Sequence, residues 1–309
     1  MILLYILFKI ATITNAEHAE VTAQKQTNEP EFLEDIIYGY ADTLALQLNM
    51  AIPNGEQFSG NKFPAIIFIH GGGWKEGHRS AYNGQIVRAA KRGYVAVTVS
   101  HRLTAVTNKY GKPLYPWPAA IHDCKAAVRF LKHVSEKYKI DPDKIGITGA
   151  SSGGHLALMI GVSDPTHNLE GDVELPTNDR FAEKISSRVQ AVVNISGPTE
   201  MVSCYEAPIV TPYLKSFLEG SPNNNPEGYK ESSPIHYVSK DDPPMMTIHG
   251  ELDEVVPVAQ AYMLDQKLKE IGMDHELKIY KGEGHIFKAP AASESWEELY
   301  RFFDRNLKN

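Results

Sequence analysis

The fold of this 309-residue chain is constrained most by a series of short apolar runs, each of the length of one strand. Continuous apolar runs of this kind are typical of strands covered on both faces. The runs cover residues 63–69, 94–99, 144–148, 189–195 and 244–248. Segments with helical spacing of apolar residues lie between them, at 80–92, 118–138 and 258–271. This alternation predicts an α/β fold: one mostly parallel central sheet with helices on both faces.

The two ends of this pattern predict further elements. Residues 44–50 and 276–280 alternate between apolar and polar side chains, which indicates half-buried strands, the second of an edge type. The last sixteen or so residues have the spacing of an amphipathic helix. No internal repeat or Gly/Ser-rich linker divides the chain, so we expect residues 32–309 to form a single domain.

Residues 199–241 interrupt the alternation with five prolines and several aromatic side chains. An insertion of this composition after a strand predicts a small cap over the mouth of an active site. The alternative is an irregular surface excursion. The sequence does not say whether such a cap acts as a lid.

The N-terminal residues predict export. Residues 1–16 resemble a signal peptide, with a short apolar core and small residues before a cleavage point after Ala16. The apolar run is too short to cross a membrane, and residues 17–31 form a polar lead-in. We therefore expect a secreted or periplasmic protein, with a cytoplasmic location as the alternative.

Composition excludes several classes of function. The formal net charge of −7, without a local cluster of lysine and arginine, argues against nucleic acid as a partner. Two cysteines, Cys124 and Cys204, are too few for a disulfide scaffold or a zinc site, and whether they pair is open. His122 and Asp123 lack neighbouring ligands, so we expect neither a metal nor another cofactor.

Two adjacent serines lie at an expected strand-to-helix junction, in the hexapeptide Gly-Ala-Ser-Ser-Gly-Gly. Ser151 fits the pattern G-x-S-x-G, and Ser152 fits the looser A-x-S-x-G. A nucleophile on such a sharp turn needs small residues two positions before and after it. Gly149 is the smallest residue that can precede Ser151 in this way, which favours Ser151 over Ser152.

Catalysis by a serine also needs donors for the oxyanion, a base, and an acid that orients the base. Three consecutive glycines between His70 and Trp74 follow the apolar run 63–69 and predict exposed backbone N–H donors, with a flexible loop as the alternative. Asp253 follows the run 244–248, and His285 follows residues 276–280. The carboxyl ends of parallel strands meet at one edge of a sheet, so these groups should converge there.

The order Ser, Asp, His along the chain is that of the α/β-hydrolase fold. The segments HGGGW, GASSGGHLA, HGELDEVVP and GEGH together resemble the esterase and lipase branch of that superfamily. They are most similar to bacterial carbohydrate esterases of the acetylxylan and feruloyl esterase type, over residues 36–308. The resemblance implies that Ser151 is the nucleophile, Asp253 the orienting acid and His285 the base. Glu251 and Glu254 are the rivals of Asp253.

The resemblance also implies an oxyanion hole made of the backbone N–H groups of Gly72, Gly73 and Ser152. Which two glycines of the triplet serve is open. Trp74 is a candidate for the wall of the acyl or alcohol pocket, or else a packed aromatic beside the loop. His101 stands where relatives of the hormone-sensitive lipases have tyrosine, which argues against the lipase-like group.

Three further histidines are expected to be structural. His155 lies on the helix after the serine turn and cannot readily reach back over the serine oxygen. His70 is expected to brace the glycine loop through hydrogen bonds. His249 precedes a glycine in a turn and is expected to be a packing residue.

The expected function is hydrolysis of short acyl esters, acetyl or feruloyl, through an acyl-enzyme. The substrate would be a small-molecule or oligosaccharide ester derived from plant polysaccharide. The alternatives are an arylformamidase-like amidase, a general short-chain carboxylesterase or lipase, and a catalytically silent hydrolase fold used for binding. The sequence does not predict the oligomeric state.

Overall fold

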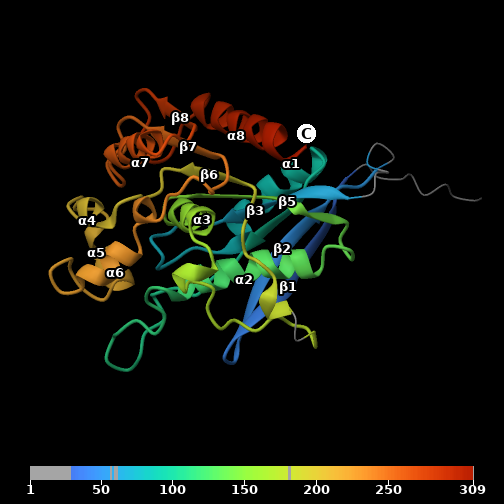
Figure 1. Cartoon of the computed structure of the whole chain (residues 1–309), viewed down its shortest axis with the longest axis horizontal. Helices are drawn as coiled ribbons and strands as arrows, with labels where there is room; N and C mark the ends of the chain where they lie inside the picture. Colours follow the sequence, from blue (N-terminus) through green and yellow to red (C-terminus); the bar gives the residue numbers. More distant parts are fainter. Residues whose placement is uncertain (1–28, 56–57, 59–61, 180–181, 309) are drawn as a thin grey trace, which may run out of the picture.

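A central sheet organises the chain in the computed structural model, which describes residues 29–55, 58, 62–179 and 182–308 (Figure 1). Its strands are β1 (Glu31–Ala41), β2 (Leu44–Ile52), β3 (Phe63–Ile69), β4 (Val95–Val99), β5 (Ile140–Ala150), β6 (Ala191–Ile195), β7 (Met245–Gly250) and β8 (His275–Tyr280). Their order across the sheet is β1-β2-β4-β3-β5-β6-β7-β8. Strand β2 is antiparallel to both of its neighbours, and every other neighbouring pair is parallel.

Helices cover both faces of this sheet. They are α1 (Asn83–Lys91), α2 (Ala119–His133), α3 (Ser152–Val162), α4 (Met201–Cys204), α5 (Thr211–Phe217), α6 (Pro226–Glu231), α7 (Ala259–Glu270) and α8 (Ala291–Leu307). One apolar cluster joins the sheet to α2, α3 and α7, and a second joins its other face to α1 and α8. The prediction of a mostly parallel sheet between two helical layers is confirmed.

Strand β3 illustrates why continuous apolar runs predicted the sheet so well. Ile67 and Ile69 pack in the first cluster, whereas Ile66 and Phe68 pack in the second. All four side chains are fully buried. Successive side chains of a strand point to opposite faces, so a strand between two helical layers needs apolar residues at every position.

Several sequence-based boundaries need correction. Strand β1 was not predicted, because its residues include several acids and its pairing with β2 shifts register twice, which obscures any alternation. The polar lead-in ends earlier than expected, since Glu31 already begins this strand. The helix predicted over 118–138 ends at His133. The proposed signal peptide, residues 1–16, lies outside the described residues.

The insertion at residues 199–241 contains the short helices α4, α5 and α6. In Figure 1 these helices lie together at one side of the molecule, on the same side as α7 and far from β1. Phe217 O accepts a hydrogen bond from Trp117 N at 2.8 Å, which ties α5 to the segment before α2. The insertion is therefore packed against the domain at the end where β3, β5 and β7 finish.

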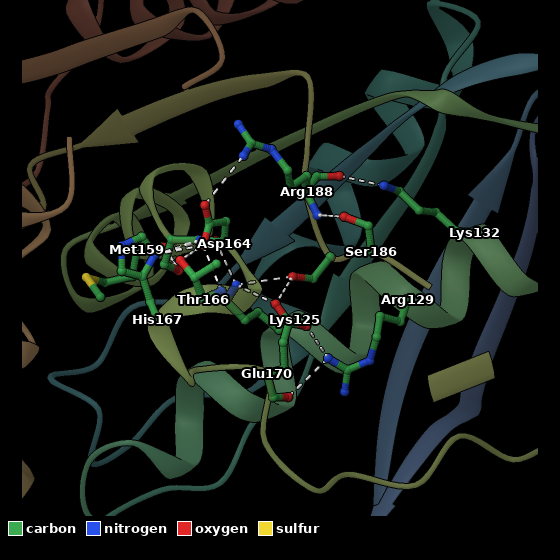
Figure 2. A network of polar contacts seen from close by, with 12 residues as sticks. Lys125, Arg129, Lys132, Met159, Asp164, Thr166, His167, Glu170, Ser186 and Arg188 are labelled. Atoms are coloured by element: carbon green, nitrogen blue, oxygen red, sulfur yellow. Dashed lines mark hydrogen bonds and ion pairs between the residues drawn. The ribbon is translucent and has the colours of Figure 1, made fainter. Parts of the chain in front are cut away.

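A buried ion-pair network fastens the long connection between α3 and β6 to helix α2 (Figure 2). The Lys125 ammonium, fully buried, donates to Glu170 Oε1 at 2.9 Å, to Ser163 O at 2.8 Å and to Ser187 Oγ at 3.1 Å. Arg129 donates to the other oxygen of Glu170 at 2.7 Å. Because each proton of the ammonium has an acceptor, the cost of burying its charge is offset locally.

Two further features bear on earlier expectations. Cys124 and Cys204 are both buried free thiols. Within the described part of the chain, no helix combines the length and the apolar character that a membrane crossing requires.

Candidate active site

Ser151 occupies a strained turn between β5 and α3. Its backbone φ is 56° and its ψ is −125°, a conformation that a residue with a side chain rarely adopts. The turn is held from both sides, because Ser151 N donates to Ile195 O at 2.8 Å and Ser151 O accepts from His155 N at 3.0 Å. Strain of this kind costs about 1–3 kcal/mol and persists where the surroundings enforce it. The turn thereby places the Ser151 side chain at the carboxyl edge of the sheet, beyond the end of β5.

The glycines on either side of Ser151 are required by close packing. A Cβ on Gly149 would lie 2.6 Å from Ile69 O and would also collide with the backbone of Gly153. A Cβ on Gly153 would lie 2.7 Å from His70 O. Helix α3 thus passes against the end of β3, and only hydrogen fits at these positions. The packing gives a physical basis for centring the turn on Ser151.

Asp253 and His285 meet at the same edge, beyond β7 and β8. His285 Nδ1 donates to Asp253 Oδ2 at 2.7 Å, so Nε2 is the nitrogen left to accept a proton. The other carboxylate oxygen accepts from the backbone N–H groups of Val255 at 2.9 Å and Val256 at 2.8 Å. Burial by itself would raise the pKa of Asp253, but hydrogen bonds from His249 and His285 outweigh burial and hold that pKa well below its usual range.

The rivals of Asp253 are placed elsewhere. Glu251 is exposed and accepts a hydrogen bond from Gly282 N at 3.1 Å, so it bridges the loops after β7 and β8. Glu254 is also exposed. Among the described residues, Asp253 is the one carboxylate of the three that accepts a hydrogen bond from His285.

The glycine loop after β3 adopts conformations that suit glycine alone. Gly72 and Gly73 have φ values of 122° and 61°. A Cβ on Gly72 would collide with Glu76 O, and one on Gly73 would collide with the ring of Tyr213. Neither glycine N–H donates to another protein atom in the described residues, so both are available to a ligand. Ser152, the first residue of α3, likewise has no acceptor within its helix.

His70 braces this loop, as predicted. Its Nδ1 donates to Gly71 O at 2.9 Å, and its ring stacks on that of His101 at a centroid distance of 4.5 Å. Burial lowers the pKa of His70 to about 3. The neutral imidazole is therefore a structural support for the donors and is poorly suited to accept a proton in turnover.

One cavity of about 300 Å³ joins these parts. Ser151, His285, Gly72 and Gly73 all line it. Its remaining walls are largely apolar and come from four segments of the chain: Trp74, Glu76, Pro198, Ile209, Val210, Tyr213, Val255 and Val256. Ile209, Val210 and Tyr213 belong to the insertion, which therefore forms one wall of the cavity. Larger hollows elsewhere on the surface contain neither Ser151 nor His285.

Trp74 is a packed aromatic beside the glycine loop, and it also borders the cavity. It lines the cavity, yet it is 1% exposed and stacks on Phe217 with a centroid distance of 4.5 Å. Its Nε1 donates to His155 Nδ1 at 3.1 Å, and His155 Nε2 donates to Ser232 O at 2.7 Å. His155 is fully buried in this chain of contacts, and its predicted structural role is confirmed.

Sequence reasoning missed two groups at the site. The lining residues of the insertion carried no signal beyond its aromatic composition, because a cap residue reaches the cavity only through tertiary packing. His249 was predicted to be a packing residue. It is fully buried, but its Nε2 also lies 3.2 Å from Asp253 Oδ2.

The parallel sheet with one antiparallel strand, the strained serine turn after β5 and the loops that follow β3, β7 and β8 together define an α/β-hydrolase. Comparison with known proteins makes the assignment narrower. The BD-FAE family model matches residues 48–268, and the chain belongs to this family.

Similar proteins of known sequence and similar solved structures include ester hydrolases. The probable carboxylic ester hydrolase LipM of Mycobacterium tuberculosis is 31% identical over 216 residues, covering 67% of this chain and 45% of LipM. The chain spans about half the length of the curated mycobacterial relatives it matches. A truncated carbohydrate esterase from gut microbiota superposes with a TM-score of 0.75 at 27% identity, covering 91% of this chain and 98% of that one.

A third similarity is to an acetyl ester-xyloside bifunctional hydrolase from Caldicellulosiruptor lactoaceticus. Its TM-score is 0.69 at 25% identity, and the match covers 85% of this chain and 89% of that one. The chain is thus an α/β-hydrolase related to carbohydrate esterases.

Proposed function

We propose that this protein is a serine esterase that hydrolyses short acyl esters through an acyl-enzyme. The observation that carries the proposal is a cavity lined by both Ser151 and His285, with His285 bonded to the buried carboxylate of Asp253. Nucleophile, base and orienting acid are the parts that serine acyl transfer needs. Membership of the BD-FAE family and similarity to known esterases support the same reaction.

In the proposed reaction, Ser151 Oγ attacks the carbonyl carbon of the ester while His285 Nε2 takes the hydroxyl proton. The backbone N–H groups of Gly72, Gly73 and Ser152 stabilise the resulting oxyanion, an interaction worth about 10²–10³-fold in rate per donor. Collapse breaks the bond to the alcohol oxygen, which receives the proton from His285. Water then attacks the acyl-enzyme with His285 again as base, releasing the acid and free Ser151.

The proposed substrates carry acetyl or feruloyl groups on plant polysaccharide fragments. A largely apolar cavity of about 300 Å³ has room for a small acyl group and offers it apolar contacts. The carbohydrate part of the proposal is supported by similarity to two solved structures, a carbohydrate esterase and an acetyl ester-xyloside bifunctional hydrolase.

The first test is turnover of p-nitrophenyl acetate together with labelling by a fluorophosphonate probe. Both should occur in the wild-type protein, and both should be lost in Ser151→Ala. A protein that neither turns over the ester nor binds the probe would contradict the proposal and would favour a silent hydrolase fold.

A substrate panel tests the finer assignment. Acetylated xylo-oligosaccharides, feruloylated arabinoxylan oligosaccharides, simple short-chain esters and N-formylkynurenine should be compared by kcat/KM. The proposal expects a carbohydrate ester to give the highest value. Preference for simple esters would indicate a general carboxylesterase, and preference for N-formylkynurenine an amidase.

We also propose that the protein is exported, with cleavage after Ala16. Expression of the full sequence in a bacterial host, followed by fractionation and N-terminal sequencing, tests this. The mature protein should begin at Glu17 and be found outside the cytoplasm. An intact N-terminus in the cytoplasmic fraction would contradict export.

A further inference from the structure

His249 lies at the end of β7, fully buried, beside the carboxylate that holds the proposed base. Its Nε2 is 2.9 Å from Val256 O and 3.2 Å from Asp253 Oδ2. A neutral imidazole has one N–H, and both neighbours are acceptors, so this nitrogen carries the proton and shares it between them. His249 therefore binds the acid and the loop that follows the acid at the same time.

Each oxygen of Asp253 receives two donors. The backbone N–H groups of Val255 and Val256 donate to Oδ1, while His285 Nδ1 and His249 Nε2 approach Oδ2. The two backbone hydrogen bonds fix the position of Oδ1 relative to the loop. The two imidazoles lie on the oxygen that faces His285, so they compete for the same negative charge.

Core packing does not explain a histidine at this position. His249 Nδ1 is buried and has no hydrogen-bond partner within the described residues. A buried polar atom without a partner costs about 1–3 kcal/mol, which a leucine or phenylalanine would avoid. The imidazole thus stabilises the fold less than an apolar side chain would. Its bond to Asp253 therefore points to a role other than core packing.

We propose that His249 is a positioning residue for the reaction: through Nε2 it orients the Asp253 carboxylate and limits how strongly that carboxylate binds His285. This inference rests on the proposed roles of Ser151, Asp253 and His285. His249 is not among the described residues that line the cavity, so it acts through Asp253 and not on the substrate.

Among the described residues, the titratable groups that interact with Asp253 include His249 from β7, His285 from the loop after β8, and Cys204 from α4. Burial raises the pKa of the Cys204 thiol to about 12, so the thiol stays neutral during assays near neutral pH. A change in the pH profile on substitution of His249 therefore reports on the Asp253–His285 pair.

The test compares His249→Phe with His249→Gln, whose amide can still donate a hydrogen bond. In H249F, kcat should fall about 10–100-fold, the range expected for a lost hydrogen bond to a charged group, with KM nearly unchanged. The acid limb of the kcat/KM profile should move to higher pH, because Asp253 without the second imidazole stabilises protonated His285 more strongly. H249Q should recover part of kcat and return the limb toward its wild-type position.

The matched control is His275→Phe. His275 is another buried imidazole bonded to a carboxylate, with Nδ1 3.1 Å from Asp265 Oδ1 and Nε2 2.9 Å from Thr247 Oγ1, but it begins β8 at the opposite edge of the sheet. Substitution of His275 should lower stability and leave the acid limb in place. If H249F does not fold, His249→Leu provides the second apolar variant for the same comparison.

The possible results separate the two levels of inference. If Ser151→Ala retains activity, the proposed function is wrong. If Ser151→Ala is inactive while folded H249F or H249L keeps wild-type kcat and an unshifted acid limb, only the role of His249 is wrong. A limb that shifts equally in H275F would also overturn it, because the shift would then reflect general loosening of the fold.

Discussion

Ser151 and Ser152 are adjacent, and the structure predicts opposite outcomes when each is replaced by alanine. Ser151 lines the cavity with His285 on a turn held at φ 56°. Loss of a serine nucleophile removes nearly all catalysis beyond that of binding and the oxyanion donors, so Ser151→Ala should reduce kcat about 10⁴-fold or more. Stability should change little, because alanine meets the same backbone strain that serine does.

Ser152 is 2% exposed, and its Oγ has no hydrogen-bond partner in the part of the chain that the structure describes. Alanine removes this unpaired hydroxyl, whose burial costs about 1–3 kcal/mol, and loses the van der Waals contacts of one atom. It also favours the first turn of α3 slightly more than serine does. Ser152→Ala should therefore keep the backbone N–H and most of the activity, and unfold at the same denaturant concentration or a higher one.

The assays are p-nitrophenyl acetate turnover, active-site titration with a fluorophosphonate, and denaturant unfolding of both variants. An inactive Ser152→Ala beside an active Ser151→Ala would refute the reasoning and shift the nucleophile by one residue. Ser152→Ala with normal kcat but a loss of more than about 2 kcal/mol in unfolding free energy would show that the buried hydroxyl has a partner after all.

Three further predictions concern other parts of the molecule. Glu170→Gln should lower the unfolding free energy by about 3–5 kcal/mol, because it leaves the buried Lys125 ammonium without its counter-charge. The control Glu136→Gln, which removes an exposed ion pair with Lys62, should cost less than about 1 kcal/mol. Equal effects of the two substitutions on denaturant unfolding would contradict this prediction. Burial lowers the pKa of His155 to about 4, so its contribution to stability is present above pH 6.5 and is lost as the pH falls toward 4, at about 1.4 kcal/mol per pH unit. His155→Gln should therefore make the unfolding free energy less dependent on pH between 6.5 and 4. An unchanged slope would show that His155 does not contribute to this pH dependence. Tyr213→Ala should enlarge the cavity, and it should raise kcat/KM for p-nitrophenyl hexanoate relative to p-nitrophenyl acetate about tenfold or more. An unchanged ratio would show that the acyl group does not bind beside Tyr213.

The sequence alone was enough to predict the layered fold and the candidate triad residues. A strand buried on both faces, such as β3, requires apolar residues at every position, so it is visible as a continuous run. Parallel strands share one carboxyl edge, so Ser151, Asp253 and His285 could be expected together from their places after three predicted strands. The glycines beside Ser151 are visible in the sequence as part of the motif, although the atoms that exclude a Cβ at Gly153 belong to the end of β3.

Only the tertiary structure decided which side chains surround that edge. Tyr213 reaches the cavity because α5 packs over the glycine loop, and His249 meets Asp253 because the loop after β7 folds back on its own strand. The irregular strand β1 forms because β2 offers it an unpaired edge, and not because its own residues alternate. These features depend on distances between residues far apart or on the path of a loop. Local periodicity predicts neither these distances nor the path of a loop. It does predict whether a strand is buried, and the sequence gives the order of the residues that follow each strand.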